Sequence, residues 1–370
     1  MLKPAQIVRG FPFAICCQMP KTTSMSSPDA HSRGIKRSRS HNKSPLPKTN
    51  RPDLKHRVKF FIISDTHDLL PTTDPTSAFR PPPYDTDVIL HCGDLTEDGM
   101  PLSISAGLKM LGGLPGELKL LIAGNHEISL DKEYWLTQTD SVSGHERAIA
   151  MVHNAAIEHG VTYLTEGMHT FTLKSGAAFS VYATPYTPKF GESAFQYESN
   201  EDRFNVTSPS WAVNVSTPAS RVPAGVDIMM SHGPAKYILD NNTGTEHGSS
   251  AGCPHLRRAL VRAKPKLFCF GHVHKGWGAQ RLEYPKIGTT KAGEDGTGLQ
   301  DEEDGLVVYP KEWVGGANQL RRQGFARISE NAEQQVRDGD FGLALNAAVK
   351  SVDDAGPNPG WLVELELESR

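Results

Sequence analysis

The stretch VKFFIISDTH, residues 58–67, joins a mainly apolar run to the polar residues Asp65 and His67. A short apolar run of this kind is typical of a buried β-strand, and the polar residues then fall where the strand ends and a loop begins. Four other runs end in the same way beside polar residues, at 87–91, 119–122, 226–230 and 266–270. Sites in open α/β sheets lie at this edge, so the five strand ends predict one shared site.

The residues at these strand ends are carboxylates, an amide and imidazoles. They lie in five segments: DTH (65–67), GD (93–94), GNHE (124–127), SHG (231–233) and GHVH (271–274). Three carboxylate or amide oxygens and four imidazoles form a mixed ligand set that suits two adjacent divalent ions of the Mn, Fe or Zn type. The expected cofactor is therefore a pair of such ions.

Strand and helix patterns alternate along the chain, which indicates an α/β fold. Helices are predicted at 102–111 and 142–159, each after a predicted strand. Short apolar runs at 170–173 and 179–182 have no long helix between them, so we expect a hairpin in a second sheet.

The five ordered segments resemble the signature of the calcineurin-like metallophosphoesterase family, in which D-x-H, G-D, G-N-H-[DE], a single His and G-H-x-H follow one another. The stretches YATPYTPKFG (182–191) and DIMMSHGP (227–234) resemble the branch called metallophosphoesterase-domain-containing proteins. The similarity runs from about residue 58 to residue 365, apart from an acidic insertion. It implies a four-layer sandwich, in which two packed mixed β-sheets are flanked by helices.

The resemblance also implies a role for each motif residue. One ion would be held by Asp65, His67, Asp94 and His274, and the other by Asp94, Asn125, His232 and His272. His126 follows a ligand and is expected to act as general acid or to stabilise the transition state. Glu97 is either the acid partner of His126 or a solvated loop carboxylate. Glu127 is either such a partner or a residue in the first turn of the next helix.

The activity implied by the resemblance is hydrolysis of a small phosphoester, a phosphodiester such as a cyclic nucleotide, by a hydroxide that bridges the two ions. Two alternatives are a phosphomonoesterase or protein phosphatase on the same fold, and a non-catalytic binding module. Glu97 and Asp98 stand where Ser/Thr protein phosphatases carry Asp-Arg, and the missing Arg, which normally grips phosphate, disfavours the first alternative. Every ligand position is filled, which disfavours the second.

The charge of the chain is unevenly distributed. Residues 1–57 hold 12 Lys and Arg against two acids and are rich in Ser and Pro, so we expect a disordered basic segment. Residues 58–370 carry 27 basic against 40 acidic side chains and are expected to form one metallophosphoesterase domain. An acidic insertion is predicted on its surface at about 291–340, before apolar residues at 341–348 and 361–365 return to the core.

The same features limit partners and location. An acidic body argues against nucleic acid as a partner, and no apolar run approaches the roughly 20 residues of a membrane-spanning helix. Five cysteines without a paired pattern favour a reducing compartment, so a cytoplasmic protein is expected. The basic segment leaves open a nuclear address centred on residues 36–39 or a mitochondrial presequence. The sequence does not define the oligomeric state.

Several residues outside the ligand set have structural interpretations. Three aromatic residues either form a wall for a base or pack in loops: Tyr197, Phe204 and Trp211. Gly271 is expected to let the backbone turn and so present the two histidines that follow it. The remaining histidines, His91 and His255 among them, are given no role.

Overall fold

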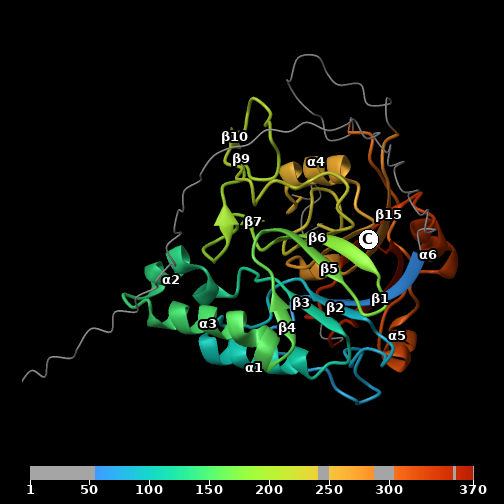
Figure 1. Ribbon diagram of the computed structural model, residues 1–370, viewed down its shortest axis with the longest axis horizontal. Coiled ribbons are helices and arrows are strands. Elements are labelled where there is room, and N and C mark those ends of the chain that lie inside the picture. The colour runs from blue at the N-terminus through green and yellow to red at the C-terminus, as the bar shows by residue number, and fades with distance from the viewer. Residues whose placement is uncertain (1–54, 241–249, 287–303, 353–355, 370) are drawn as a thin grey trace, which may run out of the picture. The chain divides into compact units, whose positions relative to one another are not determined.

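The computed structural model describes residues 55–240, 250–286, 304–352 and 356–369 (Figure 1). Within them, one sheet has the strand order β16 (Trp361–Glu368), β1 (Lys55–Ile63), β2 (Val88–His91), β3 (Leu118–Leu121), β4 (Val161–Tyr163). A second sheet has the order β14 (Val307–Val308), β13 (Gly278–Glu283), β15 (Gly342–Asn346), β12 (Leu267–Phe270), β11 (Ile228–Ser231), β6 (Ala178–Thr184), β5 (Gly167–Thr172). Two small ribbons pair β7 (Thr187–Pro188) with β8 (Gln196–Tyr197), and β9 (Glu201–Asp202) with β10 (Val213–Asn214).

Both large sheets are mixed. Strands β1, β2, β3 and β4 run parallel, and β16 pairs antiparallel with β1. In the second sheet β6, β11, β12 and β15 run parallel, with antiparallel β5 beside β6 and β13 beside β15. The predicted hairpin in a second sheet is confirmed, because it corresponds to β5 and β6.

The alternation of side chains along β1 explains how the layers pack. Phe60 and Ile62 point into a core shared by the two sheets, where the Phe60 ring packs edge-on against Phe179 with centroids 5.5 Å apart. Phe61 and Ile63 point to the other face, which helices cover. A parallel strand buried on both faces needs apolar residues at every position, which is why this run of the sequence is continuous.

Helices cover the outer face of each sheet. α1 (Pro101–Gly112) and α3 (Ser143–Glu158) pack on the first sheet, and α4 (Pro254–Ala263) packs on the second (Figure 1). Pro101 and Pro254 occupy the first turns of α1 and α4, where a missing N–H costs nothing. The order of layers is therefore helix, sheet, sheet, helix, and the predicted four-layer sandwich is confirmed.

Shorter helices complete the described fold. They are α2 (Lys132–Gln138), α5 (Ala317–Gln323), α6 (Glu330–Arg337) and two 3₁₀ turns, Ile128–Leu130 and His274–Gly276. In the described part of the chain, no helix is both long enough and apolar enough to cross a membrane.

The C-terminal part differs from the sequence prediction. A surface insertion was expected at about 291–340. Residues 291–303 lie outside the described ranges, and residues 304–340 include side chains that are buried in the core. Leu320, Ala332 and Val336 are buried in the core shared by the sheets. Ala332 and Val336 are four residues apart, so they share one face of α6 and turn it inward. For this portion the prediction of a surface insertion was wrong.

The predicted disordered segment, residues 1–57, lies outside the described residues up to residue 54. Residues 55–57 already belong to β1, where they pair with Glu366, Leu367 and Glu368 of β16. The strand therefore begins three residues before the predicted boundary.

We predict that Phe60→Ala lowers the free energy of unfolding by about 3–5 kcal/mol, because it leaves a cavity between the sheets. Phe190→Ala is the matched control, since Phe190 is 77% exposed and its truncation should change stability by less than about 0.5 kcal/mol. Urea denaturation followed by tryptophan fluorescence measures both. Equal losses in the two variants would contradict the placement of Phe60 in the shared core.

Candidate metal centre

The strand order brings the five motif loops to one edge of the two sheets. Because β1, β2 and β3 are parallel, the loops that follow them leave the first sheet on the same side. The loops after β11 and β12 leave the second sheet in the same manner. Backbone hydrogen bonds join adjacent loops: the N–H of Asp65 donates to the carbonyl of Gly93, and that of Gly271 to the carbonyl of His232, each at 2.9 Å.

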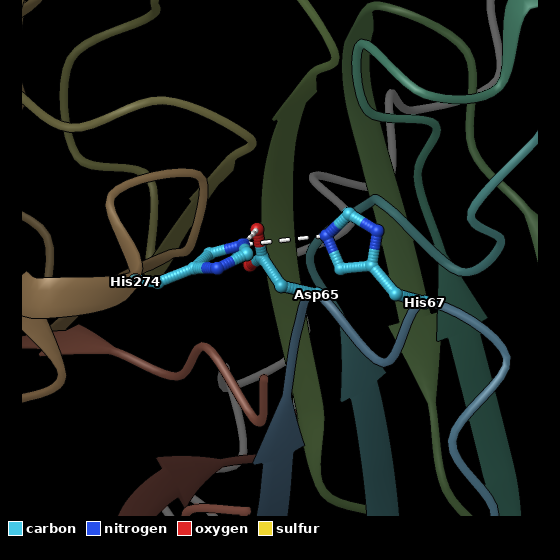
Figure 2. A group of neighbouring side chains, drawn as sticks. All are labelled: Asp65, His67 and His274. Carbon is cyan, nitrogen blue, oxygen red and sulfur yellow. Dashed lines mark hydrogen bonds and ion pairs between the residues drawn. The ribbon is translucent and has the colours of Figure 1, made fainter. Parts of the chain in front are cut away.

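Asp65, His67 and His274 form a first group of candidate ligands (Figure 2). Nε2 of His274 lies 3.2 Å from Oδ1 of Asp65 and 3.3 Å from Nε2 of His67. Asp65 is fully buried, and its carboxylate also accepts from the N–H of His272 at 2.9 and 3.0 Å. A carboxylate and two imidazoles thus converge from two different sheets.

Asp94, His232 and His272 form a second group, which Asn125 joins. Nε2 of His232 lies 3.3 Å from Oδ2 of Asp94 and 2.9 Å from Oδ1 of Asn125. The same Oδ2 of Asp94 lies 3.6 Å from Nε2 of His67 in the first group. Asp94 therefore stands between the two groups, where a carboxylate can face two cations.

The donor set of this cluster fits divalent ions. Nδ1 of His232 donates to the carbonyl of Cys92 at 2.9 Å, so its Nε2 is the nitrogen that faces Asp94 and Asn125. Nitrogen and oxygen lone pairs pointing at one another at such distances require a proton or a cation between them. A second hydrogen bond that orients the far nitrogen is typical of metal-binding imidazoles.

Charged groups also lie beside His67, although its Nδ1 has no hydrogen-bond partner of good geometry among the described residues. The carboxylate of Glu97 lies 2.9 Å from Nδ1 of His67, and Nζ of Lys350 donates to the same carboxylate at 2.6 Å. Nε2 of His67 is thereby the nitrogen turned towards His274. Lys350 lies beyond the motifs, and only the fold places it here.

The backbone at the site is bent as well. Four candidate ligands have a positive φ, which non-glycine residues rarely adopt: Asp65 (51°), His67 (44°), Asp94 (51°) and His272 (65°). Each such residue costs on the order of 1–3 kcal/mol, and strain of this kind gathers where side chains must be aimed for function. The turn after β1 brings Asp65 and His67, two residues apart, into one group of candidate ligands, whereas the turn after β12 directs His272 and His274 to different groups.

Electrostatics couple the buried groups. Burial is the largest single influence on Asp94 and opposes its ionisation, but the charge and hydrogen bond of His232, together with the charges of His126 and His67, hold the pKa of Asp94 well below its usual value. For His232, burial lowers the pKa, yet the neighbouring Asp94 carboxylate raises it to about 9. Burial, followed by the charge of Asp94, raises the pKa of Glu127 to about 7.

Glu127 performs neither of the roles expected from sequence. Its buried carboxylate accepts from the N–H groups of Asp94 at 2.9 Å, Thr96 at 3.0 Å and Gly124 at 2.7 Å. It therefore ties the loop after β2 to the loop after β3. Loops on adjacent parallel strands can be joined in this way by one side chain, but the motif spacing alone does not show it.

His126 lies beside the cluster and is partly exposed. Its Nδ1 donates to the backbone carbonyl of Glu97 at 2.7 Å, which leaves Nε2 as the other ring nitrogen. Its N–H donates to Oδ1 of Asp94 at 2.9 Å, and its ring packs edge-on against His67. Glu97 thus contacts His126 through its main-chain carbonyl and His67 through its carboxylate, and a carboxylate oxygen of Glu97 also lies within 4.8 Å of a ring nitrogen of His126.

The structure corrects one structural interpretation, that of Gly271, and gives His91 a structural contact. Gly271 does not have a positive φ; instead, a Cβ atom there would overlap Oδ2 of Asp65 and Oγ of Ser64, so the absence of a side chain makes room for a ligand. His91, given no role, is buried below the site with its Nε2 2.9 Å from the hydroxyl of Thr66.

The three loop aromatic residues pack in the fold and do not form a base-binding wall. Tyr197 and Phe204 are buried and pack edge-on against each other, and the half-exposed Trp211 stacks on His255. A different aromatic residue, Phe190, lines a cavity together with His272. An aromatic residue within a loop gives no sequence signal that separates these outcomes.

Comparison with known proteins agrees with this geometry. The model of the calcineurin-like phosphoesterase family matches residues 58–276, and the chain belongs to this family. It is 30% identical to metallophosphoesterase domain-containing protein 1 of Homo sapiens over 60% of its own length and 62% of that protein. It is 32% identical to a probable rhamnogalacturonate lyase C of Emericella nidulans over 60% of its length but 18% of that protein. The chain thus spans less than two thirds of each of these relatives.

Solved structures are more distant. The phosphopantetheinyl hydrolase PptH of Mycobacterium tuberculosis is 15% identical, with a TM-score of 0.38 over 59% of this chain and 83% of that one. The protein TT1561 of Thermus thermophilus is 11% identical, with a TM-score of 0.36 over 72% of this chain and 96% of that one.

We predict that Gly271→Ala reduces metal binding by about tenfold or more, because the added methyl group displaces Asp65. Gly316→Ala is the matched control, since a Cβ atom there meets no other atom within 4 Å. Mass spectrometry of protein dialysed against buffered Mn²⁺ gives the metal content of both variants. Wild-type metal affinity in Gly271→Ala would contradict the close approach of Asp65.

Proposed function

We propose that the protein hydrolyses phosphodiesters with two divalent ions bound at the candidate metal centre. The observation that carries this proposal is the convergence of two ligand groups on Asp94, whose Oδ2 lies 3.3 Å from His232 and 3.6 Å from His67. The proposed first set is Asp65, His67, Asp94 and His274, and the second is Asp94, Asn125, His232 and His272. Neither set is a closed cage of thiolates such as structural zinc sites use.

Ions held in this way would supply Lewis-acid charge that activates water and neutralises the phosphoryl oxygens. The protein side chains contribute by positioning the ligands of these ions. Asp94 belongs to both ligand sets and so keeps them next to each other. Glu127 joins the two loops that carry Asp94 and Asn125, and the carboxylate of Glu97 lies against His67. A substrate phosphoryl group placed here needs no side-chain nucleophile.

His126 is the proposed proton donor to the leaving alkoxide. Because Nδ1 donates to the carbonyl of Glu97, Nε2 is the atom left to carry a proton to that oxygen. The ring is partly exposed, so a leaving group can reach it. Stabilisation of the transition state by the protonated ring is the alternative role for the same atom.

The charges beside the site support a diester more than a monoester. A phosphomonoester carries an additional negative charge, which protein phosphatases offset with arginine. Here that position is occupied by Asp98, and Glu97 precedes it. The side chain of Asp98 accepts from the N–H of Met100 at 2.9 Å, so it stabilises its own turn. The charge of Glu97 is offset by Lys350, so the negative charge of Asp98, in the place of a cation, is what disfavours a dianionic ester.

A substrate screen tests the proposal directly. Purified full-length protein is dialysed free of metal, reloaded in turn with Mn²⁺, Ni²⁺, Zn²⁺ and Mg²⁺, and assayed on matched mono- and diesters of 4-nitrophenol. We expect turnover of the diester with at least one transition metal and none after chelation. Higher kcat/KM on the monoester would favour the phosphatase alternative, and no turnover with any metal would favour a binding module.

We predict that Asp94→Asn lowers kcat by at least about 10³-fold, because it removes the charge that the two cations share. Asp98→Asn changes the same functional group four residues later, outside the ligand set, and should retain activity. Activity and bound metal are measured on the same samples. An Asp94→Asn protein with two bound ions and full turnover would contradict the assignment of Asp94 as a shared ligand.

We predict that His126→Ala keeps its metal content while kcat falls by about 10²- to 10⁴-fold, the range for loss of a general acid. The exposed His153 of α3 provides the control, His153→Ala. If the loss disappears for an ester with a good phenolate leaving group, His126 acts as acid. An equal loss on good and poor leaving groups indicates charge stabilisation, and loss of metal would show that His126 is a ligand.

A further inference from the structure

A cavity of about 580 Å³ lies directly beside the candidate metal centre. His272 and His274, one from each proposed ligand set, form part of its wall. Val273 lies between them in the same motif, and most of the remaining wall comes from segments outside the ligand motifs, among them the loop after β7 and the loop after β11. A group attached to a phosphoryl centre at the metals would therefore have this space to occupy.

The charge of this cavity is opposite to that of the body of the protein. Three lysines line it, Lys189, Lys236 and Lys275, and its described wall contains no Asp or Glu. Residues 58–370 as a whole have 13 more acidic than basic side chains. A cluster of three cations in an acidic body concentrates a positive field at one place, and such fields attract anions.

The lysines differ in their surroundings. Nζ of Lys189 donates to Glu198 at 3.0 Å, at an exposed position where such a pair contributes little energy. Nζ of Lys236 lies 4.8 Å from the centre of the Tyr237 ring. Lys275 is exposed in the turn that carries His274, and no acidic side chain of the described residues pairs with it. Of the three lysines, Lys275 is the one that directly follows a candidate ligand, His274, in the sequence.

Apart from Ser199 and Ser250, the remaining wall is mainly apolar. Phe190 is 77% exposed at the cavity, with Pro188 and Val273 alongside. Apolar side chains beside cations suit an organic molecule whose carbon atoms contact the wall while a charged group meets the lysines. Inorganic phosphate would leave this apolar surface uncovered.

We propose that the natural substrate is an organic phosphoester that carries a second anionic group, a phosphate or a carboxylate, on the part of the molecule that is not the leaving group. The cavity binds this second group through Lys189, Lys236 and Lys275, with Phe190 against the connecting atoms. The inference rests on the proposed phosphodiesterase function and adds a specificity site to it.

The experiment compares esters that differ only at the second group. In each diester, 4-nitrophenol is the leaving group, and the other alcohol is butanol, 4-phosphonobutanol or 5-hydroxypentanoate. The carbon chain of this second alcohol is the arm, and esters with arms two carbons shorter and two carbons longer are included. The phosphonate arm contains no cleavable ester, so the same bond breaks throughout. We expect kcat/KM to be about tenfold higher with one of the two anionic arms than with butyl, and the better arm identifies the anion.

Variants then assign the effect to the cavity. In Lys275→Ala and Lys189→Ala, the ratio of kcat/KM between the anionic and butyl esters should fall towards one. Lys109→Ala removes the same charge from the exposed face of α1 and should keep the wild-type ratio. As a readout independent of turnover, calorimetry measures binding of 4-phosphonobutanol to the metal-free protein, which Lys275→Ala should weaken about fivefold.

The outcomes separate this inference from the proposed function. Hydrolysis of all esters with equal kcat/KM, unaffected by either lysine variant, overturns the specificity site and leaves the phosphodiesterase proposal standing. The same change in Lys109→Ala as in Lys275→Ala also overturns it, because the effect would then be one of net charge. No turnover of any ester with any metal overturns the proposed function, and this inference with it.

Discussion

The arrangement of the site depends on the burial of three carboxylates at one edge of the sandwich. Asp65, Asp94 and Glu127 are at most 2% exposed, although removing a carboxylate from water costs several kcal/mol. The chain offsets this cost with backbone N–H groups and imidazoles: Glu127 accepts from three N–H groups, and Asp94 stands between His67 and His232. Bound cations would complete the neutralisation.

Much of this could be predicted from sequence, for a physical reason. A parallel strand buried on both faces must be apolar throughout, so a polar residue at its end is conspicuous. Asp65 and His272 each follow such a run after one intervening residue. The order of five such strand ends leaves few folds to choose from. Local patterns of this kind do not require knowledge of distant contacts.

The remaining features depend on contacts between residues far apart in the sequence. Lys350 reaches Glu97 across the sandwich, and Gly271 is required because Asp65 approaches from another sheet. The composition of residues 291–340, taken as one segment, also gave a wrong prediction. The acidic residues before 305 suggested a surface insertion, whereas Ala332 and Val336 of α6 pack in the core. A loop aromatic such as Phe204 has the same appearance in sequence whether it lines a site or fills a core.

The position of the last strands has a consequence for how the chain folds as it is synthesised. β15 lies between β12 and β13, and β16 pairs with β1 over eight residue pairs although some 300 residues separate them. Until residues 342–368 leave the ribosome, β12 lacks one neighbour and β1 remains an open edge, which favours pairing with other chains. Strand pairings so distant in the sequence form slowly. The nascent chain therefore carries its candidate metal ligands long before the sheets that hold them are closed, and this interval is where chaperones would be needed.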